Sequence, residues 1–310
     1  MKNLQYNWNN ITNLISSIRW YVQANQTYDE LEYLKTTDLE KYDNVILFLV
    51  DGLWYNWLES YWKNSFLYSR LKWQINSVFP STTSSTITTI NTWFAPSDHW
   101  VVWWNMYSKE VWWLVKILPW LNKISESNIW ENVEMKNIVS KQAFYPHSKK
   151  DVFIVTSNVF KNSKYNLFYN DKTKVLWYSD LSECFAKTIW TINFNKKQKY
   201  TYTYWPDFDR KCHDYWIDSP EVMNHFEDLD YHFEKLEKIA KETNTLVIVT
   251  ADHGQLNCDK IIDFKNYKDL EEMLLLPLAW EPRCQYCFVK KWFEEDFYNQ
   301  VKERLSDLVD

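Results

Sequence analysis

Residues 246–254 read LVIVTADHG, a short apolar run that passes directly into an adjacent carboxylate and imidazole. Four apolar residues, three of them β-branched, ahead of a turn predict a buried strand of a parallel sheet. A second run at residues 45–52, VILFLVDG, also meets an acidic residue where the strand ends. Because ligands bind at the carboxyl ends of such strands, Asp51 and the pair Asp252 and His253 predict one shared site. Carboxylates and imidazoles are good zinc ligands, although either aspartate taken alone is more typical of the start of a turn.

The composition argues against several classes of protein. The 310 residues contain no long polar linker, which favours one large domain. A net charge of −6 with mixed signs gives no basic surface for a nucleic acid polymer. No apolar run has the length of a membrane span, and residues 1–6 lack the apolar core of a signal peptide, so a cytoplasmic location is expected. The five cysteines are odd in number and scattered, which is typical of reduced thiols.

The chain has twenty tryptophans and only two glycines. Glycine normally makes up about 7% of a chain, on the order of twenty residues here. Several tryptophans stand in turns where backbone chemistry favours glycine. We interpret the sequence as a frame in which UGA encodes glycine in the source organism but has been translated as tryptophan. The alternative, a truly tryptophan-rich protein, does not explain the missing glycines. The six positions assigned to glycine are Trp54, Trp93, Trp100, Trp103, Trp216 and Trp280, whereas Trp205, before a proline, is expected to be genuine.

The first half of the chain offers one further candidate site. Residues 1–44 are expected to form a helical lead-in, and residues 45–310 one domain, in which residues 108–200 carry no strong motif. A helix is expected over roughly 55–70. Residues 79–92 begin with a Phe-Pro break and continue with crowded hydroxyl side chains, which predicts a helix start. The free N–H groups there suit a phosphate; a capped helix without chemistry is the alternative.

The second half adds an acidic and a histidine residue at helical spacing. Asp209 and His213 are four residues apart, so one helical turn would place them on the same face. A helix is then expected from Ser219, with a serine cap and proline at its first position. His225 and His232 fall off its apolar stripe and are expected to be solvated. This helix leads into the strand at 246–250, the order of elements in a doubly wound sheet.

These motifs together resemble the alkaline phosphatase superfamily, and within it most closely the type I phosphodiesterase/nucleotide pyrophosphatase family. The resemblance covers residues 45–107 and 200–290, with five motifs in family order. It implies an α/β fold, a three-layer α/β/α sandwich with a mostly parallel sheet, two zinc ions and a covalent threonine intermediate. The motifs are Asp51-Gly52, Phe79-Pro80-Ser81-Thr82-Thr83, Asp98-His99 with Asn105, Asp209-x-x-x-His213 and Asp252-His253-Gly254.

The resemblance also implies roles for individual residues. Thr83 is placed as the nucleophile, with Thr82 or Ser84 as alternatives in the same hydroxyl run, and Asn105 as an amide that steadies a phosphoryl oxygen. The residues implied to bind metal are Asp51, Thr83, Asp252 and His253 for one ion and Asp209 and His213 for the other. The family has a further histidine at the second ion, but no histidine follows His253 in this chain. Glu281, Cys284 or another downstream residue is the candidate replacement, and the alternative is a looser site that holds a different metal.

The expected function is therefore that of a metal-dependent phosphohydrolase that cleaves phosphodiester or pyrophosphate bonds. Two metals can clamp the attacking and leaving oxygens of a phosphoryl transfer. The expected cofactors are two divalent ions, zinc by preference, and the expected partner is a small-molecule phosphate ester, with nucleotides as the leading class. The alternatives are a phosphomonoesterase on the same scaffold and a non-catalytic relative. No membrane and no nucleic acid polymer are expected. A sulfatase is disfavoured, because no Cys/Ser-x-Pro-x-Arg motif is present.

Overall fold

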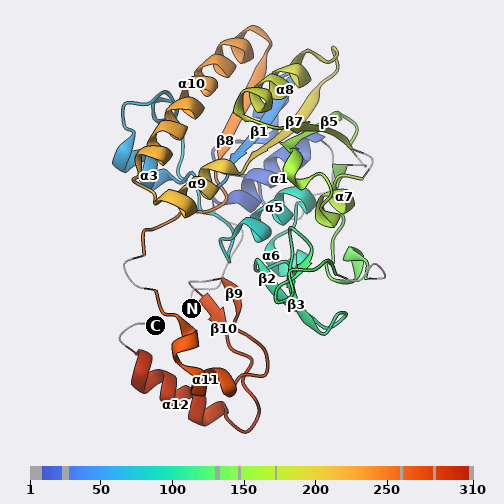
Figure 1. Ribbon diagram of the computed structural model, residues 1–310. Helices are drawn as coiled ribbons and strands as arrows, with labels where there is room; N and C mark the ends of the chain where they lie inside the picture. Colours follow the sequence, from blue (N-terminus) through green and yellow to red (C-terminus); the bar gives the residue numbers. More distant parts are fainter. Residues whose placement is uncertain are drawn as a thin grey trace.

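The centre of the molecule is a sheet of five parallel strands in the order β6-β5-β7-β1-β8 (Figure 1). The structure is a computed structural model that describes residues 9–22, 28–129, 133–145, 148–171, 173–258, 261–281 and 284–306. The sheet strands are β1 (Asn44–Val50), β5 (Asp151–Ser157), β6 (Lys174–Tyr178), β7 (Lys199–Trp205) and β8 (Thr245–Thr250). The expected α/β class with a mostly parallel sheet is confirmed, and the apparently featureless segment 108–200 supplies two of its strands.

Strand β1 explains why the sheet is covered on both faces. All seven of its residues are buried, and successive side chains of a strand point to opposite faces. Val45, Leu47 and Leu49 belong to one apolar cluster. Ile46, Phe48 and Val50 belong to another. A continuous apolar run, rather than an alternating one, is therefore what this central position requires.

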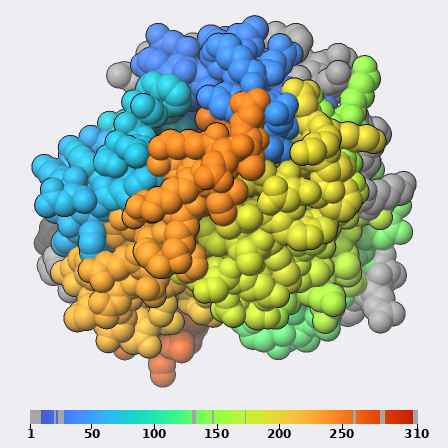
Figure 2. Space-filling model, turned by 90° about the horizontal axis from the view of Figure 1, so that it is seen from above, coloured from blue at the N-terminus to red at the C-terminus, as the bar shows by residue number. Residues whose placement is uncertain are grey.

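The two clusters define the outer layers of the sandwich. One is built with helices α1 (Ile11–Val22), α5 (Thr83–Thr92) and α7 (Lys164–Tyr169), so the helix of the N-terminal lead-in shares an apolar cluster with the sheet. The other is built with α3, α8, α9 and α10. Figure 2 views the molecule from above, with the residues near 240 in orange between those near 60 in cyan and those of α8 in yellow-green. The bounds of these helices are α3 Tyr55–Tyr61, α8 Leu181–Asn193, α9 Asp207–Tyr215 and α10 Pro220–Glu242.

Smaller elements complete the fold. A three-stranded antiparallel sheet and a two-stranded one lie outside the central sheet. Residues from about 261 onward form a unit with its own small apolar cluster, seen at the bottom of Figure 1. The remaining helices and strands are α2 Thr36–Leu39, α4 Phe66–Ser69, α6 Pro96–His99, β2 Asn105–Ser108, β3 Trp113–Lys116, β4 Leu121–Asn122, η1 Met135–Asn137, η3 Asn158–Phe160, η4 Phe264–Asn266, α11 Lys268–Glu272, β9 Ala279–Glu281, β10 Cys284–Tyr286 and α12 Glu294–Leu305. Among the described residues, no helix combines the length and apolar character needed to cross a membrane.

Three local expectations need correction. Strand β8 is an edge strand whose residues after Thr245 are only partly buried, because no strand among the described residues pairs with its outer side. The helix expected over 55–70 is two helices, α3 and α4, separated by four residues. His225 is buried rather than solvated: its Nε2 accepts a hydrogen bond from the Trp205 indole at 3.0 Å, and burial lowers its pKa to about 4. His232 is half-buried and stacks on the Phe185 ring.

Candidate active site

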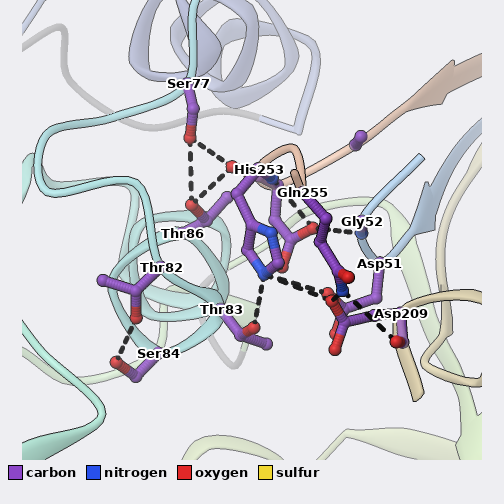
Figure 3. A network of polar contacts seen from close by, with 12 residues as sticks. Asp51, Gly52, Ser77, Thr82, Thr83, Ser84, Thr86, Asp209, His253 and Gln255 are labelled. Carbon is purple, nitrogen blue, oxygen red and sulfur yellow. Dashed lines mark hydrogen bonds and ion pairs between the residues drawn. The ribbon is translucent and has the colours of Figure 1, made fainter. Parts of the chain in front are cut away.

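The site lies where β1 and β8 end side by side. These strands pair in parallel with Leu49 opposite Thr250, so the residues that follow them emerge at the same edge of the sheet. One ligand atom from each of Asp51, Asp252 and His253 lies within 4.8 Å of the other two. The shared site expected from the two strand ends is therefore assembled by the sheet itself (Figure 3).

In each of the two buried aspartates, one carboxylate oxygen accepts hydrogen bonds from the protein and the other accepts none. Oδ1 of Asp252 accepts hydrogen bonds from the backbone N–H groups of Gly52 at 2.9 Å and His253 at 3.0 Å. Oδ2 of Asp51 accepts a hydrogen bond from the Tyr204 hydroxyl. The other oxygens, Asp51 Oδ1 and Asp252 Oδ2, are buried without a hydrogen-bond partner. Buried carboxylate oxygens in this state are costly unless a cation takes them, so these residues fit a metal ion.

The ring of His253 is oriented with Nδ1 toward the backbone and Nε2 toward the carboxylates. Its Nδ1 lies 3.2 Å from the carbonyl oxygen of Gly254, which can only accept, so Nδ1 carries the proton. Its Nε2 faces the carboxylates, 3.3 Å from Asp51 Oδ1 and 3.6 Å from Asp252 Oδ2. A backbone carbonyl that fixes the second nitrogen of a histidine is a common arrangement behind a metal ligand.

The electrostatics of the cluster also favour a cation. Burial, followed by the nearby charges of Asp252 and Asp209, raises the pKa of Asp51 well above its ordinary value. Burial likewise raises the pKa of Asp209, although His253 and His213 oppose the shift. Three carboxylates around one imidazole repel one another when all are ionised. A divalent ion would remove that repulsion.

Thr83 brings a hydroxyl to the cluster from the start of helix α5. Its Oγ1 lies 2.9 Å from His253 Nε2 (Figure 3). Thr82 precedes the helix as its cap residue, and its hydroxyl lies 3.0 Å from that of Ser84, with both side chains buried. Of the three candidate nucleophiles, Thr83 is the one that contacts His253. The helix start also places a positive dipole end beside this hydroxyl.

Asp209 and His213 lie on helix α9, one turn apart as expected. His213 Nε2 is 3.4 Å from Asp209 Oδ2, and its side chain is 70% exposed, against 16% for Asp209. Asp209 Oδ1 lies 3.9 Å from His253 Nε2, which joins this pair to the first group. Gly52 permits the approach: its φ is +73°, and a Cβ there would lie 3.0 Å from Asp209 Oδ1.

The other sequence candidates are placed as follows. Asn105 begins β2 in the three-stranded sheet, with its side chain buried. His99 is buried in α6 and its Nδ1 accepts a hydrogen bond from the Val101 N–H, which indicates a role in holding the loop. Cys284 lies exposed in β10, paired with β9 in the two-stranded sheet. The side chain of Glu281 lies outside the described residues.

Four residues of the site escaped the sequence analysis. Tyr204 binds Asp51, and Gln255 binds Asp209. Ser77 and Thr86 both donate hydrogen bonds to the carbonyl oxygen of Asp252. Tyr204 stands in an alternating YTYTYW run that marks a strand, but its partner depends on the pairing of β7 with β1. Only Gln255, next to the Asp-His-Gly motif, carried a positional signal.

A family model described as type I phosphodiesterase/nucleotide pyrophosphatase matches residues 45–309. Murine ectonucleotide pyrophosphatase/phosphodiesterase 5 has a TM-score of 0.62 at 18% identity, covering 84% of this chain and 70% of its own. Its inactive variant in complex with AMP has a TM-score of 0.58 at 17% identity, covering 82% and 68%. The human protein has a TM-score of 0.57 at 18% identity, covering 84% and 69%. These likenesses show the fold. No curated protein matches the chain.

Proposed function

Because the chain belongs to the type I phosphodiesterase/nucleotide pyrophosphatase family, we propose that it hydrolyses phosphodiester or pyrophosphate bonds of nucleotides with Thr83 as the nucleophile. The observation that carries this proposal is the Thr83 hydroxyl at the start of α5, 2.9 Å from His253 and beside the Asp51 and Asp252 carboxylates. The nucleotide class is supported by the mouse relative, an inactive form of which was solved in complex with AMP.

The residues present fit one divalent ion fully and offer two ligands to a second. Asp51, Asp252, His253 and Thr83 would hold one ion, and Asp209 with His213 would hold the second; the mixture of carboxylate and imidazole suits zinc. Such ions, when bound, lower the pKa of a coordinated hydroxyl and stabilise charge on phosphoryl oxygens. A catalytic role for both ions is part of the proposal.

The chain's own residues supply the nucleophile and the groups that bind the phosphoryl oxygens. The Thr83 hydroxyl releases its proton to solvent as its oxygen forms a bond to phosphorus and the bond from phosphorus to the leaving oxygen breaks, and the leaving oxygen takes a proton from solvent. Water then cleaves the phosphothreonine, which restores the hydroxyl. The first N–H groups of α5 are available to a phosphoryl oxygen, and the Asn105 amide is assigned to steady a second one. Tyr204 holds Asp51 in place from behind.

Turnover of p-nitrophenyl thymidine 5′-phosphate and of p-nitrophenyl phosphate, each with and without added zinc, tests the reaction. A diester preference that disappears on chelation supports the proposal. A monoester preference would instead identify a phosphomonoesterase. No turnover of either ester by folded, metal-loaded protein would identify a non-catalytic relative.

Two variants test the nucleophile. Thr83→Ala is expected to lower kcat by at least about 10³-fold, since loss of a nucleophile removes most of the rate enhancement, while zinc content and fold are kept. Thr82→Ala is the matched control, because its hydroxyl contacts Ser84 rather than His253. Acid quenching during turnover should trap phosphate on the peptide that contains Thr83. Retention of activity in Thr83→Ala with loss in Thr82→Ala would shift the nucleophile by one residue.

A further inference from the structure

Gln255 contacts the metal-ligand cluster at Asp209. Its side-chain Nε2 donates a hydrogen bond to Asp209 Oδ1 and another, at 3.2 Å, to the Asp209 backbone carbonyl (Figure 3). The other carboxylate oxygen, Oδ2, is the one that faces His213. Gln255 is partly buried and follows Gly254 in the loop after β8. It therefore fixes the orientation of Asp209 from the side of the first metal position.

The two proposed metal positions differ in what the protein supplies. The first has Asp51 and Asp252, both almost completely buried, together with His253 and the Thr83 hydroxyl. The second has Asp209 and the largely exposed His213. In the part of the chain that the structure describes, the only compact group of three or more His, Cys, Asp or Glu ligands is the first one. Catalytic zinc sites usually have three protein ligands, so the second position is one ligand short.

We propose that Gln255, which offers an amide rather than a metal ligand beside Asp209, acts as a positioning residue for this carboxylate and leaves the second ion with two protein ligands. The second ion is consequently held weakly and exchanges, while the first is retained. This inference rests on the proposed function, because it assumes that both positions take metal. An amide is a poor zinc ligand compared with imidazole, but its hydrogen bonds can orient a carboxylate that binds the ion.

The difference in affinity between the two metal positions is tested by counting retained zinc. The protein is loaded with zinc and dialysed exhaustively, and elemental analysis then gives the number of ions per chain. The full chain is expected to retain about one ion. Gln255→His places an imidazole beside Asp209 and is expected to raise this to about two. Gln255→Glu, which keeps the side-chain length and adds a carboxylate, should do the same if the histidine variant fails to fold. Gln198→His, just before β7 at its opposite end, is the matched control and should leave the number unchanged.

Two further variants test whether the gained ion occupies the second position and whether Gln255 supports it. Adding His213→Ala to Gln255→His should return the number to about one, which ties the gained ion to the second position. Gln255→Ala should weaken the second ion by roughly 10–100-fold in calorimetric titration with zinc, as loss of an orienting partner does in other metal sites. Two ions retained by the unmodified chain, or one by both Gln255 variants that add a ligand, would overturn the inference. A chain that retains no zinc would instead contradict the metal ligands of the proposed function.

An independent observation concerns the tryptophans. Seven described residues other than glycine have a positive φ, and five of them are tryptophan: Trp93, Trp100, Trp112, Trp120 and Trp216. Positive φ is uncommon outside glycine, asparagine and aspartate, and for a bulky residue it is an outlier. Three of the five directly follow helices, where glycine in this conformation is the usual terminator. Trp216, with φ 71° and ψ 154°, lies in a region that is almost exclusive to glycine.

The side chains of the two buried members of this group, Trp93 and Trp120, support the same conclusion. The buried indoles of Trp93 and Trp120 have no hydrogen-bond partner for Nε1, and the Trp93 ring centroid lies only 3.0 Å from that of Phe144. Normal aromatic pairs are 4.5–7 Å apart. By contrast, the buried Trp57 and Trp205 lie in a helix and a strand and donate hydrogen bonds, at 2.7 Å to the Ile217 carbonyl oxygen and at 3.0 Å to His225.

We infer that the protein made in its own cells carries glycine at positions 93, 100, 112, 120 and 216 and tryptophan at 57 and 205. Of the six positions assigned from sequence, three are among these five. Trp54 has φ −98° and Trp103 is not among the positive-φ residues, so the backbone gives no reason for glycine at either. The side chain of Trp280 lies outside the described residues.

Peptide mass spectrometry of the protein purified from its native cells tests this inference. Peptides that cover the seven positions are expected to show glycine at the first five and tryptophan at the other two. Tryptophan at 93, 100 and 216 would overturn the reassignment. Glycine at 57 and 205 would overturn the division of the tryptophans by their backbone conformation and hydrogen bonds.

Discussion

Replacing Trp100, Trp112 and Trp216 together by glycine should stabilise the chain as written. Their φ angles are 67°, 54° and 71°. Their side chains are 65%, 75% and 54% exposed, so little apolar burial is lost when the indoles are removed. These three positions therefore isolate the backbone effect from the packing changes that Trp93→Gly and Trp120→Gly would add.

The expected gain follows from two opposing contributions. A left-handed conformation costs a residue with a Cβ roughly 1–2 kcal/mol, and glycine removes that cost. Glycine also gives the unfolded chain more freedom, which lowers stability by about 0.4–1 kcal/mol at each position. The difference is about 0.5–1 kcal/mol per site on these figures, or about 2 kcal/mol for the triple variant. In a chain of this size that corresponds to about 3 °C in Tm.

Urea and thermal unfolding of the triple variant and the chain as written provide the measurement. Trp190→Gly and Trp292→Gly are the controls, since both side chains are also exposed but neither residue has a positive φ. Trp190 lies inside helix α8, where glycine should cost about 1 kcal/mol. Equal or lower stability of the triple variant, or an equal gain in the controls, would refute the conformational argument. If the chain as written does not fold in solution, recovery of soluble protein by the triple variant but not by the controls is the corresponding result.

Three further outcomes are expected. Tyr204→Phe removes the hydrogen bond to Asp51 Oδ2 and should weaken binding of the first zinc ion by roughly 10–100-fold in calorimetric titration; unchanged affinity would remove Tyr204 from the site. Gly52→Ala introduces a Cβ at φ +73° and 3.0 Å from Asp209, so the urea midpoint should fall by an amount that corresponds to about 1–2 kcal/mol or more. Burial lowers the pKa of His99 to about 3, so the folded protein keeps this histidine neutral where the unfolded chain, with a pKa near 6.5, takes up a proton. The free energy of unfolding should therefore fall on acidification, by up to about 2 kcal/mol between pH 6.5 and 5. In His99→Gln the fall should be smaller by that amount. Equal pH dependence in both proteins would contradict a neutral, buried His99.

The sequence was most informative where one physical requirement dominated. The uninterrupted apolar run of β1 predicted a strand buried on both faces, and the serine and proline at 219 and 220 predicted the start of α10. The spacing of Asp209 and His213 predicted one helical turn between them, which α9 supplies. In each case neighbouring residues contain the whole signal.

Other features depended on the tertiary fold and could not be predicted in this way. His225 lies off the apolar stripe of its helix, yet it is buried because Trp205 of a distant strand covers it and donates a hydrogen bond. The edge position of β8 follows from strand order, which the apolar run itself does not encode. Tyr204 and Gln255 join the site through partners 153 and 46 residues away in the chain.

The order of the strands explains why so dispersed a set of ligands forms one site. Strands β7, β1 and β8 are neighbours, and their carboxyl ends are followed by α9 with Asp209, by Asp51, and by Asp252 with His253. The three carboxylates therefore come from adjacent positions along one sheet edge, although Asp51 lies far from Asp209 and Asp252 in the sequence. Thr83 belongs instead to α5, in one of the helical layers. The proposed nucleophile therefore lies on a different element from the three carboxylates. The distance between Thr83 and the carboxylates depends on how α5 packs against the sheet. Ser77 and Thr86 supply that link, because both donate hydrogen bonds to the backbone carbonyl of Asp252 from the segment that contains Thr83.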